Sequence, residues 1–158
     1  SRIKNLVNTR NYIVDNFTRD CDYLWWVDSD FEIIPCDTLN LLIECDKDVV
    51  IPTLTNEKYE YHDCGSVVYN DDSTISRFQY INTDQNLIQL NRADVDGFIK
   101  SKVFINSIRY TYVEKTYHDG CGNIYPCYSD GTQFSFDCIN AGFGVYAARH
   151  IKIKHANV

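Results

Sequence analysis

Two acidic residues follow directly on a run of apolar residues in the first part of the chain. Residues 23–27 read YLWWV, and Asp28 and Asp30 come next, separated by Ser29. Residues two apart in an extended segment point the same way, so we expect both carboxylates to face one point. Because unpaired buried charge is costly, a divalent cation is their natural partner, and oxygen ligands favour Mg²⁺, Mn²⁺ or Ca²⁺ over Zn²⁺. Such an ion can bridge the protein to a diphosphate.

A structural interpretation of the same residues stays open. Asp-Ser-Asp is common in turns and caps, where the side-chain oxygens bond to nearby backbone groups. The apolar strand in front favours ligand binding, because a buried strand constrains where the carboxylates lie. In open α/β sheets, ligands bind beyond the carboxyl ends of the strands. Asp28 and Asp30 stand at that end of a predicted strand.

The periodicity of the apolar residues predicts the elements that position these acids. In the first third of the chain we expect helix, strand, helix and strand over residues 2–17, 22–28, 36–45 and 48–52. The strand at 22–28 is apolar on both faces, so we expect it to be central in a sheet. The strand at 48–52 is expected to end at Pro52. This order and spacing are typical of an α/β fold.

Shorter strands and one more long helix are expected in the rest of the chain. The predicted elements are, in order, three short strands (65–70, 74–81, 86–92), a strand and helical turn within 96–104, mostly loop over 110–128, a helix over 130–142 and two strands over 143–147 and 151–155. Asn, Asp and Ser separate the three short strands, which indicates an antiparallel or mixed part of the sheet. Gly142 stands where a glycine would end the helix.

Composition and charge exclude several classes of function. The 158 residues, 44% hydrophobic and 23% charged, suit one globular domain with a proper core. The net charge of −7 and the lack of a basic cluster argue against a nucleic-acid partner. No apolar run approaches the roughly 20 residues of a membrane span, so membrane contact is expected only through segments outside this chain.

The order of these motifs resembles that in glycosyltransferases with the GT-A fold. The likeness is greatest to the family of the yeast Golgi mannan polymerase subunits, in which an Arg-Asn helix leads to a Trp-rich strand, an acidic triplet and a valine-proline strand. The residues that carry it are Arg10-Asn11, Trp25-Trp26, Asp28-Ser29-Asp30 and Val50-Ile51-Pro52. Residues 128–146 resemble the acidic segment and helix beside the acceptor, and residues 151–155 resemble the last strand, which ends in a metal-binding histidine. The likeness weakens over residues 53–128.

The resemblance implies a metal site. Asp30, with Asp28 assisting, would hold Mn²⁺ or Mg²⁺ and, through it, the diphosphate of a nucleotide-sugar donor. His155 would be a further metal ligand, and an imidazole suits Mn²⁺ better than Mg²⁺. The other interpretation of His155 is a histidine that simply lies near the end of the chain.

Further residues are implied in binding the donor. Arg10 would compensate phosphate charge or tether the acidic loop, and a solvated helix arginine is the alternative. Asp94, Asp96 and Gly97 resemble the segment that lines the donor sugar, where Gly97 would allow a close approach of the backbone. An ordinary Asp-Gly turn is the alternative interpretation there.

Asp130 is the candidate catalytic residue. It matches the position where many GT-A enzymes carry a Glu-Asp pair, but here the pair reads Asp130-Gly131, so one carboxylate is missing. Helix N-capping is an equally good interpretation of Asp130. Both inversion and retention at the anomeric centre are compatible with these residues. The subfamily named above is a retaining one, in which Asp130 would orient or stabilise rather than deprotonate.

By this resemblance we expect an α/β protein with a GT-A-like (Rossmann-like) mixed sheet flanked by helices. Residues 1–158 would form a single glycosyltransferase domain that lacks its first strands. The part that binds the nucleotide base would be missing with them, so we expect a fragment of a longer protein.

The activity expected from the resemblance is transfer of a sugar, with mannose favoured, from a nucleotide-diphosphate donor to a glycan or glycoprotein acceptor. Mn²⁺ or Mg²⁺ is the expected cofactor. Two alternatives stay open: a non-catalytic sugar-nucleotide-binding subunit of a glycosyltransferase complex, and a phosphatase of the haloacid-dehalogenase type with Asp28 as nucleophile. The yeast resemblance implies the Golgi lumen, and a cytoplasmic viral or bacterial enzyme fits the residues as well.

Overall fold

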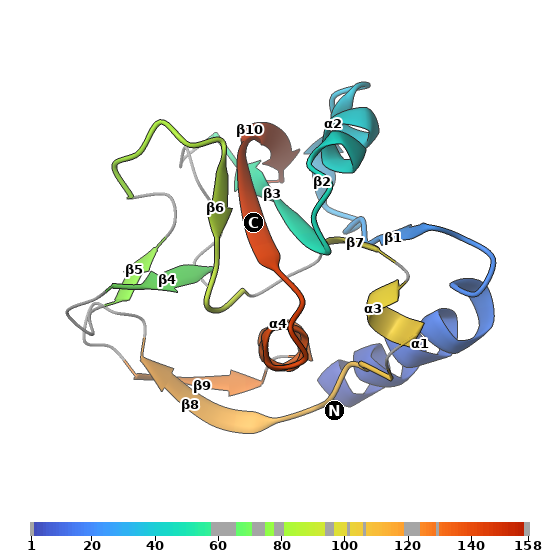
Figure 1. The fold of residues 1–158 in the computed structure, drawn as a ribbon. Helices are drawn as coiled ribbons and strands as arrows, with labels where there is room; N and C mark the ends of the chain where they lie inside the picture. Colours follow the sequence, from blue (N-terminus) through green and yellow to red (C-terminus); the bar gives the residue numbers. More distant parts are fainter. Residues whose placement is uncertain are drawn as a thin grey trace.

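Helices flank a mixed sheet in this protein (Figure 1). The computed structural model describes residues 2–57, 66–70, 75–77, 81–93, 97–100, 102–105, 107–118, 124–128 and 130–156. The helices among them are α1 (Arg2–Phe17), α2 (Thr38–Glu44), α3 (Lys102–Ile105) and α4 (Asp130–Asn140). The α/β class and the mixed sheet predicted from the sequence are confirmed.

A six-stranded sheet forms the centre, with the strand order β1-β7-β3-β10-β2 and with β6 paired to β10. Its strands are β1 (Tyr23–Trp25), β2 (Phe31–Ile33), β3 (Val49–Thr55), β6 (Leu87–Gln89), β7 (Phe98–Lys100) and β10 (Val145–His155). β3 and β10 run parallel, β7 is antiparallel to β1 and β3, and β2 and β6 are antiparallel to β10. Two small sheets pair β4 (Val67–Tyr69) with β5 (Ile75–Arg77) and β8 (Glu114–His118) with β9 (Ile124–Tyr128).

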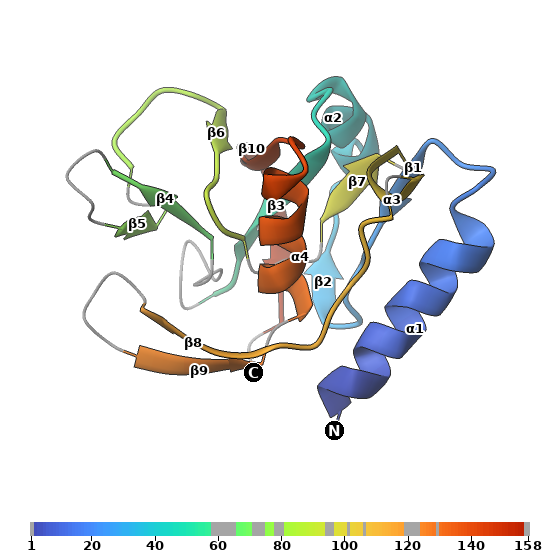
Figure 2. The ribbon, with the colours of Figure 1, turned by 60° about the horizontal axis from the view of Figure 1, so that its bottom comes forward.

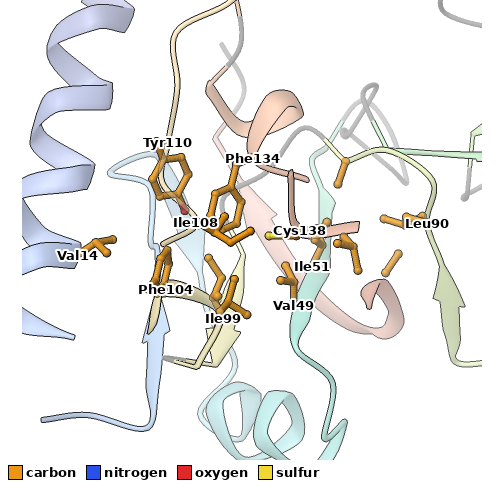
Figure 3. Packing of buried hydrophobic residues seen from close by; sticks show 14 of the residues in the cluster. Val14, Val49, Ile51, Leu90, Ile99, Phe104, Ile108, Tyr110, Phe134 and Cys138 are labelled. Atoms are coloured by element: carbon orange, nitrogen blue, oxygen red, sulfur yellow. The ribbon is translucent and has the colours of Figure 1, made fainter. Parts of the chain in front are cut away.

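Hydrophobic clusters cover both faces of the sheet, because alternate residues of its strands point to opposite sides. One cluster joins the sheet to α1, α3 and α4 and includes Val14, Ile51, Ile99, Phe104, Phe134 and Cys138 (Figure 3). The other joins the opposite face to α2 and includes Leu42, Cys45, Val50, Phe98 and Ile151. In Figure 2, α4 lies in front of β3 and β10, and α1 runs along the side of the fold.

β1 is not central, contrary to the prediction from its apolar sequence. Among the described residues it stands at the end of the strand order and pairs with β7 alone. Trp25 packs with the cluster under α2, whereas Trp26 packs with the cluster under α1, α3 and α4. The strand is apolar on both faces because a hydrophobic cluster covers each face, even though β1 stands at the end of the strand order.

β3 and β10 are longer than predicted. β3 continues through Pro52 to Thr55, and the strands predicted at 143–147 and 151–155 belong to one strand, β10. Ala148 lies opposite Pro52 and Lys152 lies opposite Thr53, so residues 149–151 bulge out of the pairing with β3. Because proline has no N–H to donate, the ladder is interrupted where the bulge occurs.

The segment over residues 110–128, predicted mostly as loop, contains the hairpin of β8 and β9, in which Glu114 pairs with Tyr128 and His118 with Ile124. Charged residues and Pro126 weaken the alternating apolar pattern that marks a strand. The remaining predicted elements are present among the described residues, although the three short strands are shorter than predicted and most of residues 78–81 lies outside the described part of the chain. α4 ends before Gly142, whose φ of +87° suits glycine.

Asp48 joins three elements at the edge of the sheet where β3 begins. Its carboxylate lies 2.6 Å from the amine of Lys102, at the start of α3, and accepts a hydrogen bond from the N–H of Gly144, before β10, over 3.1 Å. Partial burial raises the pKa of the Asp48 carboxyl, but hydrogen bonds from Lys102 and Gly144 and the charges of Lys102 and Lys100 outweigh it and lower the pKa overall.

Asp48→Asn is expected to lower the free energy of unfolding by about 1–2 kcal/mol at pH 7, because hydrogen bonds to a charged group are lost. A lowered pKa in the folded state means that this stabilisation is full above the unfolded pKa of about 3.9 and disappears as the pH falls through the folded value. Urea unfolding at pH 7 and pH 3 measures the difference. Asp46→Asn is the control, since the Asp46 side chain is 84% exposed and should matter less; equal effects of the two variants would contradict the prediction.

Candidate metal and donor site

Asp30 and His155 meet at the edge of the sheet where β10 ends. β2 begins directly after Asp30 and pairs antiparallel with the last residues of β10, so that Phe31 lies opposite His155. The N–H of Ala156 donates to the carbonyl oxygen of Asp30 over 2.8 Å. The Asp30 Oδ2 atom then lies 3.2 Å from His155 Nε2. Two segments far apart in the sequence thus bring a carboxylate and an imidazole together.

The other ring nitrogen fixes the orientation of His155. Its Nδ1 lies 2.9 Å from the carbonyl oxygen of Ala156, and because a carbonyl oxygen only accepts, Nδ1 carries a proton in this hydrogen bond. Nε2 is then the nitrogen presented to Asp30. The Phe31 ring packs edge-on against the imidazole, with the ring centroids 6.0 Å apart. The His155 side chain is 11% exposed and that of Asp30 43%, so a fixed imidazole faces a carboxylate that solutes can reach.

The pair fits the metal ion that the sequence implies. A carboxylate oxygen and the lone pair of an imidazole nitrogen repel each other unless a cation, either a proton or a metal ion, joins them. Neighbouring ligands of an octahedral ion with bonds of about 2.1 Å stand about 3 Å apart, and Asp30 and His155 present their atoms at 3.2 Å. Oxygen and imidazole donors together suit Mn²⁺.

The number of protein ligands suits an ion that also binds phosphate. Within the described ranges, no group of three or more His, Cys, Asp or Glu side chains could hold a metal ion. If Asp30 and His155 hold an ion, they supply two of its ligands, and the other positions are open to phosphate oxygens and water. Ions of this type are commonly bound by one or two carboxylates together with substrate phosphates.

Asp28 and Asp30 are not presented on extended backbone, as the two-residue spacing suggested. Residues 28–31 form a turn, in which the N–H of Phe31 donates to the carbonyl oxygen of Asp28 over 3.2 Å. The argument from strand periodicity is therefore wrong for this pair. Asp30 faces His155, and Asp28 stands at the start of the turn with a half-buried side chain.

Arg10 is buried on α1 with 6% of its surface exposed, so it is not a solvated helix arginine. Its guanidinium lies 5.4 Å from the ring centroid of Trp26 and 5.1 Å from that of Tyr110. Through these contacts Arg10 packs against the segment that leads to Asp28. A buried arginine in this place can hold that segment in position, but it is not exposed to bind a phosphate.

Gly97 lies beside the end of β1. The N–H of Trp26 donates to the carbonyl oxygen of Gly97 over 3.2 Å, which continues the pairing beyond Trp25 and Phe98. The chain that enters β7 therefore passes the same end of β1 that leads to Asp28. Asp94 and Asp96 lie outside the described residues.

α4 begins at Asp130, as expected from the sequence. The side chain of Asp130 lies outside the described part of the chain. The next residues, Gly131 and Thr132, are buried, and Phe134 packs into the core one turn further on. The start of α4 is thus fixed by the packing of its first turn.

Lys154 and its two partners are features of this edge that the sequence reasoning missed. The Lys154 amine lies 2.9 Å from a Glu32 carboxylate oxygen and 3.1 Å from one of Glu57. Hydrogen bonds to Glu32 and then Glu57 raise the pKa of Lys154. The alternation of residues 151–155 places Lys154 on the polar side of its strand, but it says nothing of which acids lie beside it. The ion pairs connect β2, β10 and the segment after β3, next to His155.

Comparison with known proteins adds no family to these observations: no protein-family model matches the chain, and no curated protein sequence matches it significantly. Among the described helices, none is long and apolar enough to cross a membrane. The functional interpretation therefore depends on the arrangement of Asp30, His155 and their neighbours.

Proposed function

We propose that this protein is a metal-dependent glycosyltransferase with a GT-A-like domain, which moves a sugar from a nucleotide-diphosphate donor to a glycan or protein acceptor. The observation that carries the proposal is the contact between Asp30 and His155, 3.2 Å apart. The resemblance in sequence implied both residues as ligands of one ion, although they belong to opposite ends of the chain. Mannose is the favoured sugar, on the resemblance alone.

Asp30 and His155 would hold Mn²⁺, with Asp28 as the nearby second acid. When bound, the ion would neutralise charge on the diphosphate as it leaves the sugar. The hydrogen bond from Nδ1 to Ala156 keeps His155 Nε2 turned toward the site. Because a ligand held in advance loses less conformational freedom on binding, this bond favours occupation of the site.

The location of the pair agrees with binding of a nucleotide diphosphate. β3 and β10 are parallel, and their carboxyl ends lie at the edge where Asp30 and His155 meet. Ligands of open α/β sheets bind beyond the carboxyl ends of strands. Gly97 would line the donor from the end of β1, and Asp130 at the start of α4 would orient or stabilise the reacting groups.

Calorimetric titration with GDP-sugars and UDP-sugars, with Mn²⁺ and with a chelator, tests the proposed function. We expect donor binding that depends on Mn²⁺ and is lost when the ion is removed, with GDP-mannose favoured. Binding unaffected by the chelator would contradict the proposal. Binding without sugar transfer or donor hydrolysis would instead support a non-catalytic sugar-nucleotide-binding subunit.

A further inference from the structure

Tyr110 lies where α1, β1 and α4 meet. Its side chain is buried, with 2% of the residue surface exposed, and it belongs to the hydrophobic cluster under α1, α3 and α4. It follows α3 in a segment without regular secondary structure. A buried tyrosine in such a segment has to satisfy its hydroxyl and its backbone through specific partners.

The hydroxyl of Tyr110 contacts the strand that leads to the acidic turn. The indole Nε1–H of Trp26 donates to the Tyr110 hydroxyl oxygen over 2.7 Å, and the two rings meet edge to face with centroids 6.0 Å apart. Trp26 stands two residues before Asp28. The hydroxyl therefore fixes the Trp26 side chain, in the short segment between β1 and the turn at Asp28.

The ring of Tyr110 contacts α4. It stacks on the ring of Phe134 with centroids 4.4 Å apart and an angle of 13° between the planes (Figure 3). Phe134 is one helical turn after Asp130, at the start of α4. One side chain thus links the strand before Asp28 to the helix that begins at the candidate catalytic residue.

The backbone of Tyr110 is held by α1. The Asn11 amide donates to the Tyr110 carbonyl oxygen over 2.9 Å, and the Tyr110 N–H donates to Asn11 Oδ1, also over 2.9 Å. The guanidinium of Arg10 lies over the rings of both Trp26 and Tyr110. These contacts hold Tyr110 from a third side. They restrict its backbone and its ring to one conformation.

We infer that Tyr110 is a positioning residue that sets the acidic turn of Asp28 and Asp30 against the start of α4. In this role it acts through Trp26 on one side and Phe134 on the other. Its role in metal and donor binding rests on the proposed function; its role in coupling the two segments does not.

Hydrogen exchange of the purified protein tests the coupling. Tyr110→Phe removes only the hydroxyl, and we expect about tenfold faster exchange at residues 26–31, because the Trp26 indole loses its acceptor. Tyr110→Leu also removes the ring stack and should add faster exchange at residues 131–136. Tyr112→Phe, which removes another hydroxyl two residues away, is the matched control and should change neither segment. Unchanged exchange at residues 26–31 in Tyr110→Phe, or an equal rise throughout the protein, would overturn the inference.

Binding of Mn²⁺, followed through the fluorescence of the only two tryptophans, Trp25 and Trp26, separates this inference from the proposed function. We expect Tyr110→Phe to bind Mn²⁺ up to about tenfold more weakly than the wild type or Tyr112→Phe, the lower end of the loss seen when a hydrogen-bond partner of a metal ligand is removed, because Tyr110 acts on the acidic turn only through Trp26. Equal affinities would overturn the positioning role alone. If the wild type bound no Mn²⁺, the proposed function and the part of Tyr110 in it would both fail, while hydrogen exchange would still decide the coupling.

Discussion

Asp30→Ala is expected to weaken Mn²⁺ binding by at least about 100-fold, because it removes one of two protein ligands from the proposed site. The fold should persist. The Asp30 carboxylate is 43% exposed, and the backbone carbonyl that accepts the Ala156 N–H is unchanged by the substitution. Loss of a partly exposed contact between a carboxylate and an imidazole costs little stability.

Titration of tryptophan fluorescence with Mn²⁺, together with urea unfolding, separates binding from stability in this variant. Asp37→Ala is the matched control, since Asp37 is also an exposed acid and its side chain makes no capping hydrogen bond to α2. We expect the control to bind Mn²⁺ as the wild type does. Wild-type affinity in Asp30→Ala would mean that the acidic turn has a structural role only.

His155→Ala is expected to weaken Mn²⁺ binding by about 10- to 100-fold and to affect Mg²⁺ binding less, because an imidazole favours Mn²⁺. The preference for Mn²⁺ over Mg²⁺ should therefore fall. A stability loss of about 1 kcal/mol should accompany it, since the partly buried hydrogen bond to the Ala156 carbonyl oxygen disappears.

His150→Ala provides the comparison for this variant. His150 lies on the same strand, β10, but is exposed, and its nearest partner, the carbonyl oxygen of Asn86, is 3.4 Å away. Competition titrations with Mn²⁺ and Mg²⁺ on both variants give the two affinities. A loss of stability in His155→Ala with unchanged metal preference would indicate a structural histidine.

The helices were predictable because their signals are local. α1 spans Arg2–Phe17 as predicted, since the spacing of Val7 and Val14 marks the buried face and the pattern does not depend on distant residues. α4 likewise begins at Asp130 and ends before Gly142. Local patterns of this kind can be read in a sequence without knowledge of the tertiary fold.

The position of β1 and the hairpin of β8 and β9 were not predictable in the same way. A strand needs apolar residues on both faces whenever both faces are buried, whether it lies in the middle of the sheet or at its end. The apolar run before Asp28 therefore indicates burial but not the place of β1 in the strand order. In β8 and β9 the residues pair with each other in a small sheet of their own, and charged residues interrupt the alternation. Strand pairing is a non-local property, and apolar periodicity detects it only where a face is buried.

The candidate site, too, could be predicted only in part, because its geometry depends on contacts between distant segments. The acidity of Asp28 and Asp30 is visible in the sequence, but the turn between them, closed by the hydrogen bond from the Phe31 N–H to the Asp28 carbonyl oxygen, is not. His155 was implicated only by resemblance, because nothing in residues 151–155 tells that their partner is the segment after β1. The antiparallel pairing of β2 with β10 creates the contact.

The bulge opposite Pro52 determines the side of the sheet on which His155 emerges. Before it, the odd-numbered Val145 and Ala147 face the cluster under α1, α3 and α4, whereas Ile151, the last residue of the bulge and also odd-numbered, packs with the cluster under α2. Residues 149–151 thus reverse the phase of the strand, because side chains alternate with period two. Single-residue insertions or deletions between the bulge and the terminus would turn the imidazole to the wrong side of the sheet, whereas changes by two residues would preserve its facing. The number of residues between the bulge and His155 can therefore change only by even numbers if the imidazole is to stay on the side of Asp30.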